Sequence, residues 1–329
     1  MRKADNKRRY LKYGIIVLSV VFLVSVALLV LNVWDKGRGV FQGQEMVDET
    51  LTYNGEEYEL KDNIETFLIL GLDKNVGEAV NDSYNNDKQA DFLLLLVFDK
   101  DAKKTSAIQI NRDTMTNINV LGVAGNRINV VNKQIALAHT YGNGRDVSCR
   151  NTADAVSELL LGVKVDHYLS LTMDAVPVMN DLVGGVEVNV LDDFTGIDDT
   201  LVKGETVTLI GEQALTYIQT RYGLEDSSNT TRMVRQRQYI NALYDKFSVL
   251  AETDDSFIVD ASLKMSDYII SDRSVTQLQE ISRKFAEYEF EGVINIEGEA
   301  TVGVEFMEFY ADSDSILEIV VENFYEIKK

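Results

Sequence analysis

The chain has 329 residues, of which 45% are hydrophobic and 26% charged, which is typical of a folded globular protein and not of a disordered one. Its single cysteine, Cys149, excludes an internal disulfide framework and a cysteine-rich zinc site. The net charge of −21 repels phosphate backbones, so we expect no nucleic-acid partner.

The N-terminus predicts a membrane anchor. Residues 1–13 carry six basic residues and one acidic residue, and residues 14–34 form an uncharged, apolar run that closes at Trp34. At about 1.5 Å of rise per residue this run spans the hydrocarbon core of a bilayer, which is about 30 Å thick. The positive-inside rule keeps residues 1–13 in the cytoplasm and places the rest of the chain outside. We therefore expect a single-pass protein of the cell membrane.

Two further inferences concern this N-terminal region. A cleaved signal peptide is the alternative, but its apolar region is normally about 7–15 residues long, and no small-x-small cleavage site follows the run closely. The lack of disulfides in an extracytoplasmic body points to a Gram-positive bacterium.

Residues 35–60 are polar and contain glycine, and we expect them to form a stalk. Residues 61–329 then form one domain, in which short apolar runs alternate with segments of helical periodicity. The expected strands are 66–72, 91–98, 106–110, 168–171, 186–190 and 292–296, and the expected helices are 151–161, a short one ending at 182, 212–222, 231–250, 275–288 and 313–325. This order predicts a layered α/β/α domain with a central, mostly buried sheet.

Several kinds of chemistry are absent from the sequence. There is no P-loop motif, so we expect no nucleotide cofactor, and neither a G-x-S-x-G nor an H-E-x-x-H motif occurs. His139, His167 and Cys149 are interpreted as structural. The polar residues 75–88 predict a solvated loop, with a calcium-binding loop as the alternative.

Charged residues stand at the ends of the predicted strands. Asp73 ends the first strand, Asp91 begins the second, and Arg112 and Asp113 follow the third. Crevices at strand ends are where α/β sheets bind ligands, and two aspartates on adjacent strands could share a Mg²⁺ ion. The pattern indicates an anion site with a metal, and ordinary solvated ion pairs are the alternative.

More basic residues lie further along the chain. Arg221 closes one predicted helix, and Arg232, Arg235 and Gln236 lie three and four residues apart on the next, so they share a helix face. Guanidinium groups suit bidentate contacts with phosphate. The helix therefore predicts part of a phosphate site.

At these residues the sequence resembles the LytR-CpsA-Psr family of bacterial cell-envelope proteins. The resemblance runs from about Phe67 to the C-terminus and is carried, in order, by FLILGLD, ADFLLLLVFD, INRDT, NRINVVN, YGNG, LVGGVEVNV, GEQALTYIQTRYG, TRMVRQRQ and DSDSILEIVVENFY. It implies a phosphotransferase that takes a glycopolymer, such as teichoic acid or capsule, from undecaprenyl pyrophosphate. The polymer is joined to a sugar hydroxyl of peptidoglycan.

The resemblance also implies roles for single residues. Asp73 and Asp91 match metal-binding aspartates, which would hold Mg²⁺ or Mn²⁺. Arg112, Asp91 and Arg221 match the catalytic positions, with Asp91 as the candidate proton acceptor and Asp113 as a residue that orients an arginine. The expected pyrophosphate-binding residues are Arg112, Arg127, Gln219, Arg221, Arg232, Arg235 and Gln236.

One position departs from the family pattern. The family's R-x-R motif reads Gln219-Thr220-Arg221 here, so a charged contact is replaced by an uncharged amide. This departure favours an alternative in which the protein is a non-catalytic sensor that binds polyprenyl phosphate. A polyprenyl pyrophosphate hydrolase, with water as acceptor, is a third possibility.

Overall fold

The computed structural model describes residues 48–73, 88–254, 256–304 and 306–328. The predicted cytoplasmic tail, the predicted anchor and residues 75–87 of the predicted polar loop lie outside the described residues. Within the described part of the chain, no helix is both long enough and apolar enough to cross a membrane.

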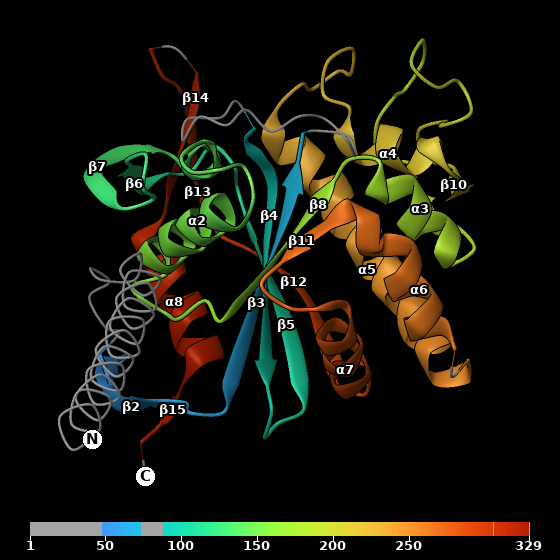
Figure 1. The fold of residues 1–329 in the computed structure, drawn as a ribbon. Coiled ribbons are helices and arrows are strands. Elements are labelled where there is room, and N and C mark those ends of the chain that lie inside the picture. Colours follow the sequence, from blue (N-terminus) through green and yellow to red (C-terminus); the bar gives the residue numbers. More distant parts are fainter. Residues whose placement is uncertain (1–47, 74–87, 255, 305, 329) are drawn as a thin grey trace, which may run out of the picture. The chain divides into compact units, whose positions relative to one another are not determined.

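A six-stranded mixed sheet forms the centre of the domain (Figure 1). Its strands, in spatial order, are β11 (Ile269–Ser271), β8 (His167–Thr172), β3 (Ile64–Leu72), β4 (Ala90–Asp99), β5 (Lys104–Ile110) and β12 (Glu289–Asn295). The three central strands run antiparallel to one another, whereas β8 is parallel to β3 and β12 is parallel to β5. The apolar runs of the sequence thus form the predicted buried sheet, which has both strand directions.

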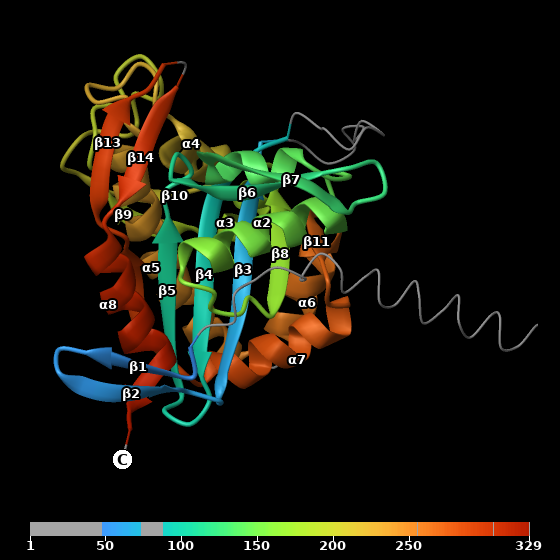
Figure 2. The ribbon, with the colours of Figure 1, turned by 90° about the vertical axis from the view of Figure 1, so that its left-hand side faces the viewer.

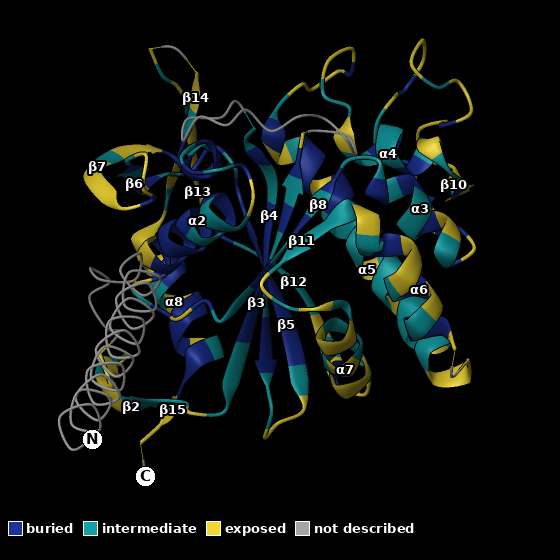
Figure 3. Cartoon of the chain, in the orientation of Figure 1, coloured by how far each residue is buried: buried dark blue, intermediate teal, exposed yellow. Residues whose placement is uncertain are grey.

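Side-chain alternation divides the central strands between two layers of helices. Leu68, Leu93 and Leu95 face a core that also contains residues of α2 (Asp146–Leu159) and α8 (Ser313–Phe324). The intervening residues face the helices on the opposite side of the sheet. Figure 3 shows that residues of the central strands are mostly buried or intermediate. These helices are α3 (Ala175–Leu182), α5 (Asn229–Thr253), α6 (Phe257–Met265) and α7 (Val275–Ala286). The arrangement is the layered α/β architecture that the sequence predicts.

Smaller elements surround the upper edge of the sheet in Figure 1. They are the hairpins β6 (Met115–Leu121)–β7 (Arg127–Gln134), β9 (Val186–Asn189)–β10 (Thr206–Leu209) and β13 (Gly298–Val302)–β14 (Met307–Ala311), with the helices η2 (Ile135–Thr140) and α4 (Glu212–Gln219). A short helix, η3 (Ser266–Tyr268), precedes β11. The β13–β14 hairpin extends beyond the sheet edge in Figure 2.

The folded domain begins before the predicted boundary at residue 61. Residues 50–60, which the composition assigned to a stalk, form β1 (Thr50–Tyr53) and β2 (Glu56–Leu60), and β2 pairs with the C-terminal strand β15 (Tyr325–Ile327) (Figure 2). Leu51 and Leu60 pack against the main core. Apolar side chains at alternating positions therefore make this polar segment a strand pair of the domain.

Two helix ends differ from the predicted ones in a way that matters for the site. Helix α4 ends at Gln219, so Arg221 lies in the loop that follows. Helix α5 begins at Asn229, where the side chain of Ser228 caps it by accepting a hydrogen bond from the backbone N–H of Thr231. The predicted phosphate-binding residues therefore lie at a loop and a helix N-terminus that face the sheet edge.

Candidate active site

The strand directions bring three predicted residues to one sheet edge. Because β3 and β4 are antiparallel, Asp73, just after β3, lies at the same edge as Asp91, near the start of β4. The antiparallel pairing of β4 with β5 brings Arg112 to this edge too. Its guanidinium contacts the carboxylate of Asp91 and the side-chain oxygen of Gln89, and its Nε lies 3.5 Å from Asp113 Oδ1.

The N-terminus of α5 adds a second arginine. Arg232 is only 5% exposed, and its Nη2 donates to the backbone oxygen of Asp91 at 3.3 Å and to Asn229 Oδ1 at 2.6 Å. Burial lowers the pKa of Arg232 to about 10, and the positive charges of Arg221 and Arg112 act in the same direction. Three arginines therefore lie within one another's electrostatic field, and Arg232 stays protonated at neutral pH.

The carboxylates at this edge are also perturbed. Burial raises the pKa of Asp91 and of Asp113, although neighbouring arginines oppose the shift in both cases. The negative charge of Asp73 raises the pKa of Asp91 further. We call the six residues that interact in this way the arginine–aspartate cluster: Asp73, Asp91, Asp113, Arg112, Arg221 and Arg232.

Two nitrogens of the arginine–aspartate cluster have no hydrogen-bond partner among the described residues. They are the buried Nε atoms of Arg112 and Arg232. Leaving a buried donor unsatisfied costs about 1–3 kcal/mol, and more when the group is charged. The two nitrogens thus favour an oxyanion bound between the arginines.

Arg235 is not part of the arginine–aspartate cluster. Its side chain is fully buried, and its guanidinium pairs with Asp192 and donates to the backbone oxygens of Tyr217 and Thr220. All three guanidinium nitrogens are therefore used within the protein. The residue supports the loop that carries Arg221 and does not present its charge to the sheet edge.

Of the three remaining predicted phosphate contacts, Gln219 and Gln236 line the same cavity, and Arg127 is not among the residues that line it. Arg127 is the exposed first residue of β7, where its charge acts on the carboxyl of Asp154. Gln236 is buried and donates to the backbone oxygen of Ile218 at 3.2 Å. Gln219, at the end of α4, is exposed and lines a cavity next to the arginine–aspartate cluster.

The described residues contain no group of three or more His, Cys, Asp or Glu side chains that could hold a metal ion. Asp73 and Asp91 nevertheless lie close enough for the charge of one to raise the pKa of the other. Mg²⁺ commonly takes one or two carboxylates and completes its shell with water and substrate phosphate oxygens. The two aspartates therefore fit such an ion when a phosphate ligand is also present.

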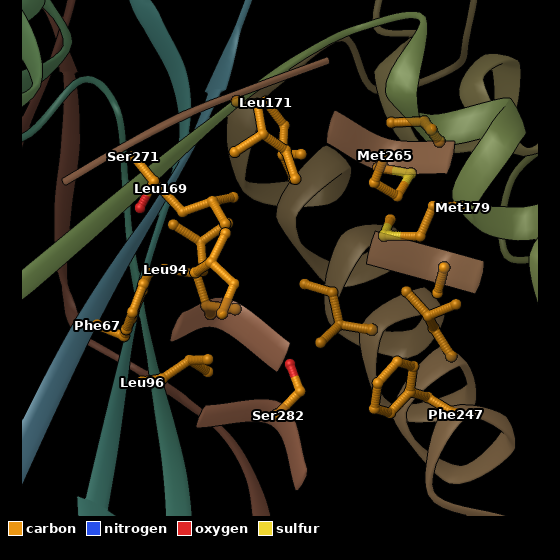
Figure 4. Close-up of a pocket in the computed structure, with 18 of the residues that line it drawn as sticks. Phe67, Leu94, Leu96, Leu169, Leu171, Met179, Phe247, Met265, Ser271 and Ser282 are labelled. Atoms are coloured by element: carbon orange, nitrogen blue, oxygen red, sulfur yellow. The ribbon is translucent and has the colours of Figure 1, made fainter. Parts of the chain in front are cut away.

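A cavity of about 740 Å³ opens beside the arginine–aspartate cluster, between the sheet and the helices α3, α5, α6 and α7. Asp91, Arg232 and Gln236 line its polar end. Most of its other lining residues are aliphatic or aromatic, and Figure 4 shows leucines of β4 and β8 facing methionines of α3 and α6 across it. A polar end joined to a mostly apolar interior suits an amphiphilic ligand.

Comparison with known proteins identifies the family of this chain. Residues 39–318 match the model of the LytR_cpsA_psr family. The chain belongs to this family. Two relatives are polyisoprenyl-teichoic acid–peptidoglycan teichoic acid transferases named TagU. The Enterococcus faecalis TagU is 27% identical over 82% of this chain and 80% of its own, and the Bacillus licheniformis TagU is 26% identical over 96% of both chains.

The solved structures agree with the membership. The structure of TagT bound to LIIa-WTA aligns with a TM-score of 0.59 and 23% identity, and the alignment covers 79% of this chain and 89% of that one. At this identity the similarity concerns the fold. This LytR_cpsA_psr protein therefore shares the mixed α/β architecture of TagT.

Two polar residues beside the arginine–aspartate cluster of this LytR_cpsA_psr protein were not predicted from the sequence. Asn111 and Asn229 are both buried, and their side chains hydrogen-bond to each other. A signal for Asn111 was present, because Gln109 and Asn111 are alternate polar residues at the end of an apolar strand. Nothing in the sequence indicates that Asn229 lies opposite Asn111, since the two are 118 residues apart.

Proposed function

We propose that this protein is a phosphotransferase that moves a cell-wall glycopolymer from undecaprenyl pyrophosphate to a sugar hydroxyl of peptidoglycan. One observation carries the proposal: Arg232, whose buried Nε has no hydrogen-bond partner among the described residues, lines a large and mostly apolar cavity and lies close enough to Arg112 to feel its charge. A ligand that satisfies both parts has an anionic head and a long apolar tail. The names of the TagU relatives supply the polymer class, teichoic acid, and the acceptor, peptidoglycan.

In the proposed complex the pyrophosphate of the donor lies against Arg112, Arg221 and Arg232, and the polyprenyl chain occupies the cavity. Arg112 and Arg232 are fixed by contacts to the side chain and backbone of Asp91, respectively, so their charges need little reorganisation when substrate binds. Fixed donors aimed at developing negative charge are usually the largest electrostatic contribution to catalysis. The arginines would therefore stabilise the charge that accumulates as the pyrophosphate bond breaks.

The reaction that we propose needs no nucleotide. The acceptor hydroxyl oxygen attacks the phosphorus that carries the glycan, forming a phosphodiester, and the bond to the lipid-bearing phosphate breaks. Polyprenyl phosphate leaves with the bond electrons. We assign the hydroxyl proton to the carboxylate of Asp91, because burial raises its pKa and moves it towards the pKa of an effective general base.

Asp73 and Asp91 are also the residues that would hold Mg²⁺ or Mn²⁺. Such an ion, when bound, supplies positive charge that neutralises phosphate oxygens. The two roles of Asp91 have different experimental signatures. Loss of a metal ligand is partly offset by a higher Mg²⁺ concentration, whereas loss of a proton acceptor is not, so Asp91→Asn and Asp73→Asn are compared across Mg²⁺ concentrations.

The predicted membrane anchor, residues 14–34, supports a location of the domain at the outer surface of the cell membrane. A single span with a cytoplasmic N-terminus would hold the domain outside the membrane, beside its lipid-linked donor. Protease treatment of intact cells tests this orientation: it should digest the domain and spare an N-terminal tag.

The proposed activity is tested with the full chain in detergent micelles. The protein is mixed with a glycan-linked polyprenyl pyrophosphate, Mg²⁺ and nascent peptidoglycan, and glycan covalently attached to peptidoglycan is measured. Attachment that is lost in Arg112→Ala supports the transferase. Bound lipid without attachment would instead support a sensor, and glycan phosphate released into solution would support a hydrolase.

A further inference from the structure

Two asparagines connect the elements that carry Arg112 and Arg232. Asn111 follows β5 directly and precedes Arg112 of the arginine–aspartate cluster. Asn229 is the first residue of α5. Asn229 Nδ2 donates to Asn111 Oδ1 at 2.7 Å, and Asn229 Oδ1 accepts from Arg232 Nη2 at 2.6 Å. The backbone N–H of Asp113 also donates to Asn111 Oδ1, at 3.0 Å. The four groups form one continuous chain of hydrogen bonds.

The direction of this chain is fixed by chemistry. A guanidinium and a backbone N–H can only donate, so Arg232 requires an oxygen from Asn229, and Asp113 requires an oxygen from Asn111. Asn229 must then turn its NH₂ group towards Asn111, as the structure has it. Flipping either amide would lose a hydrogen bond in a buried site. Each asparagine amide therefore has one orientation. The hydrogen bonds through the two asparagines connect the guanidinium of Arg232 to the backbone of Asp113 and restrict its position.

We infer that Asn229 and Asn111 are positioning residues that hold the guanidinium of Arg232 at a fixed position relative to the guanidinium of Arg112. They do so without occupying the Nε of either arginine: that of Arg232 has no hydrogen-bond partner among the described residues, and that of Arg112 lies 3.5 Å from Asp113 Oδ1. This inference depends on the proposed function, because the relative position of the two guanidinium groups matters when both contact one pyrophosphate. Asn229 itself contacts no reacting atom and acts through Arg232.

A second set of hydrogen bonds between β5 and α5 also fixes the position of the helix relative to the strand. Gln109, in β5, lies two residues before Asn111, and Gln236 lies seven residues after Asn229 on α5, so each pair has side chains on the same side of its segment. Gln109 Nε2 donates to Gln236 Oε1 at 3.1 Å, and Arg237 Nη1 donates to Gln109 Oε1 at 2.9 Å. The strand and the helix are thus joined at two levels, and the Asn111–Asn229 pair is the level beside the arginine–aspartate cluster.

Two isosteric variants separate positioning from charge. Asn111→Asp keeps an oxygen for both of its donors, so the chain of hydrogen bonds survives. Asn229→Asp keeps the contact with Arg232 but sets a carboxylate oxygen against Asn111 Oδ1, so the chain breaks. Each variant adds one negative charge to the same buried pair. Because only the carboxylate of Asn229→Asp would contact Arg232 directly, the uncharged Asn229→Ser is measured beside the two variants and shows the effect of the broken hydrogen bond without an added charge.

The full chain in detergent micelles is assayed for transfer and, separately, for equilibrium binding of a water-soluble short-chain polyprenyl pyrophosphate. We expect Asn229→Asp to bind this probe about 10-fold more weakly than Asn111→Asp, because Arg232 is displaced from one phosphate contact. We expect its kcat to be about 10- to 100-fold lower than that of Asn111→Asp, since small misplacements at a reacting centre are costly. Thermal unfolding confirms that both variants are folded.

The outcomes distinguish this inference from the proposed function. If the wild-type protein binds the probe but transfers nothing, the proposed function fails, and the ratio of the two dissociation constants still tests the positioning role. If the two variants match in affinity and in kcat, the positioning role is wrong even though transfer occurs. Should Asn229→Asp fail to fold, Asn229→Ser replaces it, because a hydroxyl is too short to reach both partners and adds no charge.

Discussion

The guanidinium of Arg235 is paired with the carboxylate of Asp192, and the Arg235 side chain is only 1% exposed. Arg235 lies on the same helix as Arg232, three residues later, yet its contacts are to the segment after β9 and to backbone oxygens of the α4 region. Arg232 and Arg235, three residues apart on α5, therefore have different roles. Arg232 faces the sheet edge, whereas Arg235 holds the loop that carries Arg221 against α5.

We expect Arg235→Met to destabilise the protein without acting directly on phosphate binding. Removal of one partner from a buried ion pair typically costs about 3–5 kcal/mol, because the other charge stays buried and unpaired. Urea unfolding measures the loss. The double variant Arg235→Met/Asp192→Asn should recover part of the stability, and a single variant with unchanged unfolding free energy would contradict this assignment.

Arg112→Ala should reduce transfer by more than about 100-fold, because it removes a fixed positive charge from the developing anion. The fold should persist, since the residue lies at the sheet edge and is not part of the core. Initial rates of glycan attachment measure the effect. Arg283→Ala, on the exposed surface of α7, is the matched control and should leave the rate unchanged. Transfer at the wild-type rate in Arg112→Ala would remove this arginine from the mechanism.

Gln219→Arg should tighten the binding of a polyprenyl pyrophosphate by about 10-fold, because a charge-assisted hydrogen bond replaces a neutral one at the polar end of the cavity. Isothermal titration with a short-chain probe measures the dissociation constant. Gln219→Met fills a similar volume without charge and should not tighten binding. Equal affinity of the arginine variant and the wild type would mean that Arg112, Arg221 and Arg232 already saturate the pyrophosphate.

The buried carboxyl of Asp154 should make stability depend on pH. Burial raises its pKa to about 8, against the charges of Arg127 and Arg150 and a hydrogen bond from Asn119. An unfolded aspartate titrates near about 3.9, so between about pH 4 and pH 8 the folded state holds more protons than the unfolded state. The stability that this proton provides is complete below that window and is lost as the pH rises through about 8.

Asp154→Asn removes this titration and should flatten the pH dependence of the unfolding midpoint between pH 5 and pH 9. Circular dichroism melts across that range compare the variant with the wild type. Glu158→Gln, an exposed change on the same helix, is the control and should retain the wild-type slope. A wild-type midpoint that rises across this range would be opposite to the expected sign.

The apolar cavity should select for chain length. Leu171→Trp places a larger side chain in the cavity, so we expect weaker binding of a long polyprenyl pyrophosphate and little change for a short one (Figure 4). The ratio of the two dissociation constants measures the effect and cancels any general loss of stability, which is about 1–3 kcal/mol for overpacking. Parallel losses for both chain lengths would place the tail outside the cavity.

The sequence by itself determined five of the six strands of the central sheet and most helices, because apolar runs and 3.6-residue periodicity depend on local patterning. The three-residue edge strand β11 is too short to show such a pattern. It also placed Asp73, Asp91 and Arg112 at strand ends, where alternation and strand direction put them at one edge. The hairpins β6–β7 and β13–β14 were not predicted, because their short strands have weak patterns and are stabilised by pairing. For the same reason residues 50–60 were predicted to form a stalk. They are strands because β1 pairs with β2 and β2 pairs with β15, which is more than 260 residues away in the sequence.

Only the tertiary structure decided which basic residues share the site. Arg232 and Arg235 have the same chemistry and neighbouring positions in the sequence, and their separate roles follow from what each meets across the helix. The Asn111–Asn229 contact joins residues 118 positions apart, so no local pattern could reveal it. Propensity and periodicity act over a few residues, whereas a binding site is defined by groups that packing brings together from distant parts of the chain.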